Sequence, residues 1–165
     1  MKKLLIIIGI VLLHSSCLRV TFSGASIHPE AKTFSVQYFE NNASLVQPVL
    51  SQVLTEQLRD KIMGQTQLSM VSSGGDMAFE GEITGYTLSP VAIQSGETAQ
   101  LTQLTITISV RFFNALDDSK NFESRFSRYQ QFSTSANFSS VEEGLVEDIV
   151  AELVEDIFNK AFVNW

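Results

Sequence analysis

Residues 101–114, LTQLTITISVRFFN, carry the clearest structural pattern in the chain. Apolar side chains occupy every second position over 104–112, and Thr, Ser and Arg fill the positions between them. Such alternation is typical of a β-strand with one buried and one solvent-exposed face. We therefore predict an amphipathic strand that contributes Ile106, Ile108 and Val110 to a hydrophobic core.

Two further runs, residues 77–88 and 122–132, flank this strand, and polar segments join them to it. The three runs together predict an antiparallel meander. Gly81 and Gly85 interrupt one face of the first run, which indicates a β-bulge or a close approach of another part of the backbone.

Two shorter runs extend the predicted sheet at residues 33–39 and 67–71. The first alternates, and the side chains expected on one face are Phe34, Val36 and Tyr38. The second is followed by SGGD at 73–76, a glycine-rich segment that predicts a turn. A sheet of four to five strands, mostly antiparallel, is therefore expected.

Two stretches show helical spacing. Apolar side chains recur every three or four positions over 49–62, with Ser44 as the candidate cap and Gly64 as the expected stop. A second helix is predicted to begin at Ser139 or Ser140. Its apolar rows are Leu145, Ile149, Leu153 and Ile157, and Val146, Val150, Val154 and Phe158. Two amphipathic helices and a half-polar sheet can bury each other, so the predicted fold class is α+β with two layers. Leu54 of the first helix and Leu145, Ile149 and Leu153 of the second are expected in the core.

The first 16 residues are organised like a secretory signal. Lys2 and Lys3 precede an apolar run at 4–13. This run is shorter than the roughly 20 residues that a membrane-spanning helix needs. We predict that 1–16 is a lipoprotein signal peptide, 17–32 a lipidated tether and 33–165 a single domain.

Cys17 is the only cysteine of the chain, so it cannot form an internal disulfide. Ser15 and Ser16 are the small residues that a lipoprotein signal peptidase requires, although His14 stands where an aliphatic residue is usual. We predict lipidation of Cys17, with a buried or reactive thiol as the alternative. Leu18 follows the cysteine where an Asp would favour the inner membrane, so an outer-membrane lipoprotein facing the periplasm is expected.

The composition permits a core and argues against some partners. Hydrophobic residues make up 44% of the chain, charged residues 18%, and the net charge is -7. A nucleic-acid-binding domain usually carries a basic patch, so no nucleic-acid partner is predicted. The acidic balance also disfavours broad electrostatic adhesion to anionic membrane surfaces.

Residue types that carry out chemistry are scarce beyond the signal segment. His28 is the only histidine there, and it lies in the predicted tether. The sequence has no phosphate-binding loop, dinucleotide fingerprint or nucleophile elbow. Glu80 and Glu82 stand two apart on one strand face, where solvent exposure is expected. We therefore predict that the chain is no enzyme and needs neither a metal nor another cofactor.

Several stretches resemble, in the same order, the LptE family of lipopolysaccharide-assembly lipoproteins. They are FSGASI at 22–27, VQYFENNA at 36–43, PVLSQ at 48–52, TE at 55–56, FEGEITGY at 79–86, LTITI at 104–108, EDIFN at 155–159 and NW at 164–165. Each segment alone is short, but their common order covers nearly the whole mature chain.

The resemblance implies a two-helix α+β lipoprotein of the outer membrane. It implies a plug inside the barrel protein LptD, which helps deliver lipopolysaccharide to the outer leaflet. Loop aromatics and amides near Tyr86, Gln94 and Gln100 are our candidate barrel contacts, with ordinary exposed loop residues as the alternative interpretation. An adaptor or pilot lipoprotein for another outer-membrane secretion pore is the alternative.

Some members of the family are also expected to bind lipopolysaccharide through basic residues. The candidates here lie on or beside the last two predicted strands, and ordinary surface charge is the alternative interpretation. They are Arg111, Lys120, Arg125 and Arg128.

Overall fold

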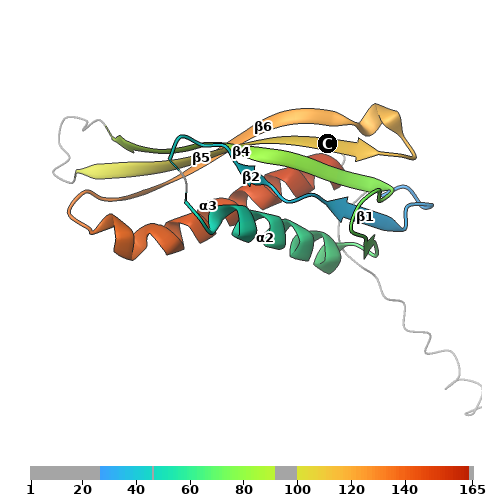
Figure 1. The fold of residues 1–165 in the computed structure, drawn as a ribbon, viewed down its shortest axis with the longest axis horizontal. Helices are drawn as coiled ribbons and strands as arrows, with labels where there is room; N and C mark the ends of the chain where they lie inside the picture. Colours follow the sequence, from blue (N-terminus) through green and yellow to red (C-terminus); the bar gives the residue numbers. More distant parts are fainter. Residues whose placement is uncertain (1–26, 46, 92–99, 164–165) are drawn as a thin grey trace, which may run out of the picture.

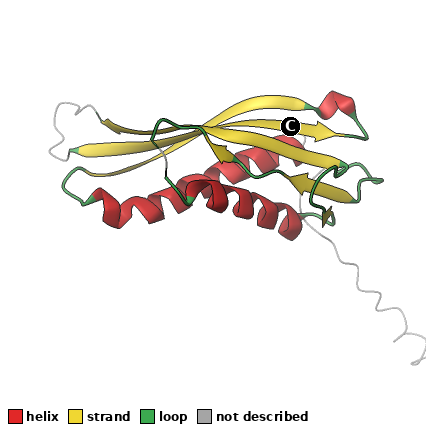
Figure 2. Cartoon of the chain, in the orientation of Figure 1, coloured by secondary structure: helices red, strands yellow, loops and turns green. Residues whose placement is uncertain are grey.

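The structure, a computed structural model, describes residues 27–45, 47–91 and 100–163. In these residues a sheet of six strands forms one layer and two long helices form the other (Figures 1 and 2). The strands are β1 Thr33–Val36, β2 Glu40–Asn41, β3 Ser69–Met70, β4 Met77–Pro90, β5 Leu101–Asn114 and β6 Phe122–Ser133. The helices are α2 Leu50–Gln65 and α3 Phe138–Phe162, and a short 3-10 helix, η1 Asp118–Lys120, joins β5 to β6. The predicted α+β class is confirmed.

The strand order is β3-β1-β4-β5-β6, with β2 beside β4. Strands β4, β5 and β6 form the predicted antiparallel meander. The short strands differ from the prediction, because β1 pairs in parallel with β3 and β4, and β2 pairs in parallel with β4. The sheet is therefore mixed, and it has six strands rather than four to five.

Both helices pack on one face of the sheet, where the core lies (Figure 1). The apolar side of β5 is buried as predicted, and its buried side chains are Leu104, Ile106, Ile108, Val110 and Phe112. Leu54 of α2 joins them, as do Ile149 and Leu153 of α3. Leu145, expected in the same row, is only partly buried against the core.

The predicted strand at 33–39 is broken in the structure. Its alternation fails at Tyr38, which is 51% exposed, whereas Phe39 is fully buried. Two side chains of α2 satisfy the backbone at the break: Thr55 Oγ1 accepts a hydrogen bond from Phe39 N–H at 3.1 Å, and Arg59 Nη2 donates to the Val36 carbonyl at 2.8 Å. Because buried backbone groups need partners, these two bonds allow the chain to leave the ladder.

The bulge predicted from the glycines of β4 is present. The register with β5 shifts between Ile83 and Gly85, so the buried positions change phase and Tyr86 turns toward the helices. Tyr86 is 1% exposed, and its hydroxyl donates to Glu142 of α3 at 2.6 Å. Burial, with the bond to Glu142, raises the pKa of the Tyr86 hydroxyl well above its ordinary value. The prediction that Tyr86 is a surface contact is therefore wrong.

The helix boundaries also differ from those predicted. Helix α2 begins at Leu50 rather than near Ser44, and Gln47 Oε1 accepts hydrogen bonds from the N–H groups of Val49 and Leu50. Its last turn continues through Gly64. Helix α3 begins at Phe138, and the side chain of Asn137 caps it by accepting from the Ser139 N–H.

The predicted turn at 73–76 is present and is fastened to the start of β1. Gly74 has a φ of 66°, a left-handed conformation that glycine adopts without a steric cost. Asp76 Oδ2 accepts three hydrogen bonds of 2.9 Å, from the N–H groups of Lys32 and Thr33 and from the Thr33 hydroxyl. These bonds, first the one from the Lys32 backbone, lower the pKa of Asp76.

We expect Asp76→Asn to destabilise the domain at pH 7 and to have little effect at pH 2. The pKa of Asp76 is lower in the folded state, so its charge stabilises the fold above the ordinary pKa of 3.8. That contribution is lost as the pH falls through the folded-state pKa. Urea midpoints at both pH values measure the difference. Asp60→Asn, on the exposed side of α2, is the matched control, and an equal loss at both pH values would contradict the prediction.

Candidate functional site

The face of the sheet opposite the helices is covered by no described element (Figures 1 and 2). Side chains alternate along a strand, so those between the core positions of β4, β5 and β6 point toward this face. We call this surface the open face. Its polar members are Glu80, Glu82 and Thr87 of β4, Gln103, Thr105, Thr107, Ser109 and Arg111 of β5, and Glu123, Arg125, Ser127, Tyr129 and Gln131 of β6. Ala78 of β4 and the exposed Phe113 of β5 lie on the same face, next to Glu80 and Arg111.

One half of the open face is polar and uncharged. Thr107 Oγ1 and Ser127 Oγ lie 3.0 Å apart across two strands, and Gln131 Nε2 donates to Gln103 Oε1 at 3.4 Å. Hydroxyl and amide groups can each donate and accept, so these side chains keep hydrogen-bonding capacity for another molecule. Tyr129 projects from the same half and is 54% exposed.

The other half of the open face is charged. Arg111 Nη2 lies 3.0 Å from Glu80 Oε2, and Arg111 is directly opposite Glu123 on the neighbouring strand. Arg125 stands one row away, opposite Ser109. The side chains of Arg111 and Glu80 are 53% and 37% exposed. An exposed pair of this kind contributes about 0–1 kcal/mol, so it orders the surface more than it stabilises the fold.

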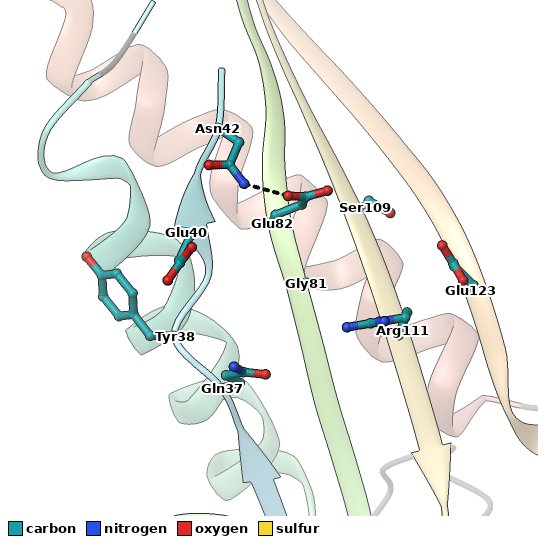
Figure 3. A pocket seen from close by; sticks show the side chains of 9 residues that line it. All are labelled: Gln37, Tyr38, Glu40, Asn42, Gly81, Glu82, Ser109, Arg111 and Glu123. Atoms are coloured by element: carbon teal, nitrogen blue, oxygen red, sulfur yellow. Dashed lines mark hydrogen bonds between the residues drawn. The ribbon is translucent and has the colours of Figure 1, made fainter. Parts of the chain in front are cut away.

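A shallow depression of about 330 Å³ lies where β2 meets the charged half (Figure 3). Glu40 of β2 is directly opposite Glu82 of β4, and Asn42 Nδ2 donates to Glu82 Oε2 at 2.6 Å. Tyr38 and Arg111 also line the depression. Carboxylates outnumber the single Arg in its lining, so it favours a basic or hydrogen-bond-donating group over an anion.

The four predicted basic residues do not form one cluster. Arg111 and Arg125 share the open face, whereas Arg128 lies on the helix side of β6, opposite Ile106. Two nitrogens of Arg128 donate to the Asp156 carboxylate of α3 at 2.7 Å, and this bond raises the pKa of Arg128. Lys120 lies in η1, beside a separate depression near the tether.

Sequence reasoning missed the contribution of the broken edge strand. Tyr38, Glu40 and Asn42 reach the depression only because the chain leaves the ladder after Val36 and rejoins it at β2. A regular alternation over 33–39 contains no signal of that break. Among the other residues predicted from the sequence, Cys17 and Gln94 lie outside the described residues, and Gln100 is exposed just before β5.

Metal clusters and membrane-spanning helices are absent from the parts of the chain that the structure describes. Across 27–45, 47–91 and 100–163, no three His, Cys, Asp or Glu side chains are grouped to hold a metal ion. Within those ranges no helix has the length and apolar character needed to cross a membrane.

The chain belongs to the LptE family, whose description is lipopolysaccharide-assembly and which matches residues 31–161. The match confirms the family resemblance of the sequence and supports a membrane-associated lipoprotein of lipopolysaccharide assembly. No curated protein sequence matches the chain.

Solved structures share the fold at low sequence identity. A minor lipoprotein from Acinetobacter baumannii is 13% identical with a TM-score of 0.52, over 79% of this chain and 91% of that one. A hypothetical protein from Chlamydia trachomatis is 8% identical with a TM-score of 0.50, over 81% and 99%. These two likenesses are of fold alone. The rare lipoprotein B of Shewanella oneidensis is also similar, at 12% identity and a TM-score of 0.47, over 78% of this chain and 92% of that one.

Proposed function

We propose that this protein is a non-catalytic lipoprotein of the outer membrane, anchored through Cys17 and facing the periplasm. In this proposal it plugs the LptD barrel and helps assemble it for transport of lipopolysaccharide to the outer leaflet. The observation that carries the proposal is the match to the lipopolysaccharide-assembly family over residues 31–161.

The open face supports a plug inside a barrel. Barrel lumens are lined by polar side chains and are often filled by a plug. A surface of Thr, Ser and Gln can exchange hydrogen bonds with such a lining, and it costs less to desolvate than a charged one. Exposed aromatic side chains often anchor an interface, and Tyr38 and Tyr129, at 51% and 54% exposure, are the candidates.

Direct contact with lipopolysaccharide is a second part of the proposal. Arginine binds phosphate groups well because its planar guanidinium offers paired donors. Arg111 and Arg125 are neighbours on the open face, and Lys120 lies in the connection of the same hairpin. Because Arg111 is paired with Glu80 and lines the carboxylate-rich depression, Arg125 is the stronger candidate of the two. Arg128 would have to exchange its bonds with Asp156 for a phosphate, so we expect it to contribute least.

Affinity purification from detergent-solubilised membranes tests the barrel partnership. We expect an outer-membrane barrel of the LptD class to co-purify with the tagged, full-length protein. Ser127→Arg, which adds a charge and bulk to the neutral half of the open face, should lower the recovered barrel several-fold. Gln52→Arg adds the same side chain to the exposed side of α2 and should leave recovery unchanged.

Depletion of the protein separates this function from the alternative. If the proposal is correct, depletion leaves the barrel misassembled and lipopolysaccharide stalled in the periplasm. Normal barrel abundance and normal surface lipopolysaccharide would contradict it. The adaptor or pilot of another secretion pore would then be the better assignment.

A further inference from the structure

Among the described strands, β6 is the last of the sheet and pairs only with β5 (Figure 1). Just beyond it the Thr134 N–H donates to the Gln100 carbonyl at 2.9 Å, and the register with β5 runs without interruption along the strand. Backbone groups of an antiparallel strand point alternately to its two sides. Even-numbered residues of β6 therefore bond to β5, whereas Glu123, Arg125 and the following odd-numbered residues present N–H and C=O groups to the edge that pairs with no described strand.

The sequence at the start of this edge is symmetric in its chemistry. Residues 122–126 read FESRF, with an acid and a base equally spaced about Ser124. If two copies of β6 pair antiparallel about Ser124, Glu123 of each copy lies directly opposite Arg125 of the other. Phe122 then lies opposite Phe126, and the small Ser124 side chains meet at the two-fold axis. Opposite charges and aromatic pairs at facing positions stabilise strand pairing.

Other registers lack this complementarity. Facing residues must lie on the same side of a continuous sheet, so only alignments that keep even opposite even are allowed. Centring the pair on Glu123 or Arg125 places like charges at the axis, and centring it on Arg128 does the same. Alignments centred on Phe126 or Ser127 bring no acid opposite a base.

We propose that β6 is a self-recognition edge, which pairs with β6 of a second copy of this chain about Ser124. The two Glu123–Arg125 positions supply the hydrogen-bonded pairs of the new ladder, and Ser124 supplies the non-hydrogen-bonded pair at its centre. The carboxylate of Glu123 and the guanidinium of Arg125 are solvent-exposed, so neither has to leave the core to pair.

The surroundings of the edge are compatible with this pairing. Phe122 and Phe126 are partly buried against the core, and Lys160 of α3 lies over their rings at 5.1 and 6.0 Å. At the end of the paired segment Arg128 of one copy approaches Lys120 of the other. The carboxylates of Asp156 and Glu152 offset the charge of Arg128 there.

The paired segment is short, so the interface is smaller than the roughly 1,200–2,000 Å² of a stable complex. Confinement of both copies to one membrane raises their effective concentration, which favours a contact that is weak in solution. This part rests on the proposed lipid anchor, so the test is made with the full-length protein in its native membranes. The proposed pairing concerns copies of the protein whose β6 edge is not occupied by another protein.

Oxidative cross-linking of Ser124→Cys tests the proposed axis. Facing residues of a non-hydrogen-bonded pair have Cα atoms about 4.5 Å apart, within the range of a disulfide. We expect a disulfide-linked dimer of this variant in membranes treated with a mild oxidant. Ser127→Cys is the control on the same strand, because its two copies would be separated by six residues, about 20 Å. The parent chain shows any background from Cys17.

Charge exchange tests the pairing itself. In the Ser124→Cys background, Glu123→Arg and Arg125→Glu each place like charges opposite one another twice, and each should lower the cross-linked fraction by about tenfold. The double variant restores opposite charges and should restore the dimer. Three results would overturn the proposal: a Ser124→Cys protein that stays monomeric or links to a different protein, equal linking through Ser127→Cys, or no recovery in the double variant. Barrel co-purification is measured separately, so failure here is distinct from failure of the proposed function.

Discussion

Gly81→Ala is expected to lower the free energy of unfolding of the domain severely. A Cβ built at Gly81 would lie 2.3 Å from the Ser109 carbonyl oxygen and 2.6 Å from the ring of Phe39. The first contact is with backbone and the second with a fully buried ring, so neither neighbour can move cheaply. Overpacking of a core costs about 1–3 kcal/mol and occasionally more, and we expect a loss of about 3 kcal/mol or more here.

Urea denaturation of the purified domain measures this loss, and a second glycine supplies the control. Gly144 lies on the exposed side of α3, and a Cβ there would meet no atom within 4 Å. Gly144→Ala should therefore stabilise the fold, by about 0.5–1 kcal/mol, since alanine favours helix. An unchanged midpoint for Gly81→Ala would show that Phe39 does not lie over Gly81 in solution.

Cys17→Ala is expected to abolish lipidation and to leave an uncut or a soluble protein. The motivation is the signal at residues 1–16 and the two serines before the only cysteine. Each buried acyl methylene contributes about 0.8 kcal/mol, so a cysteine with several chains holds a protein almost permanently, and the substitution removes that anchor. Membrane fractionation and palmitate labelling should show an unlabelled protein that is either uncut or soluble.

A matched change in the predicted tether, Ser23→Ala, should leave labelling and fractionation as they are in the unchanged protein. If Cys17→Ala were still processed and still recovered with the membranes, the lipid anchor would have to be abandoned. The family assignment would remain, because the match begins at residue 31.

The parts of the fold predicted from the sequence are those set by long, local patterns. Strand β5 alternates over five buried positions, and each of its core residues is buried as expected. The apolar rows of α2 and α3 are long enough to identify both helices. These patterns are visible in a short stretch of sequence, because the spacing of apolar residues shows which side chains face the core and which face solvent.

The parts that could not be predicted depend on contacts between distant segments. Val36 and Phe39 leave the β1 ladder because α2 bonds their backbone and Gly81 makes room for the Phe39 ring. The parallel pairing of β1 and β2 with β4 likewise joins segments that are far apart in the sequence, so no short sequence pattern predicts it.

One part of the candidate site could have been predicted from the sequence, and another part could not. Strand alternation separates Arg128 from Arg111 and Arg125, because β6 pairs Arg128 with the buried Ile106 and Arg125 with the exposed Ser109. In the sequence of β6, Arg125 is at an odd position and Arg128 at an even one, so alternation alone predicts that they lie on opposite faces of the sheet. The carboxylates of Glu40 and Glu82 come together only through the broken edge, which the sequence pattern does not reveal.

The bulge between Ile83 and Gly85 also determines which residue of β4 can be deleted with the least damage. Across it, β4 uses one more residue than β5, since Ile83 faces Ile108 and Tyr86 faces Ile106. Loss of Thr84 would make the ladder regular and would leave Tyr86 opposite Ile106 on the core side. Loss of one residue elsewhere in β4 would turn a neighbouring stretch of side chains to the wrong surface, because faces alternate along a strand. A one-residue deletion in β4 is therefore tolerated best at residue 84, where it would alter the local twist of the sheet more than the pattern of burial.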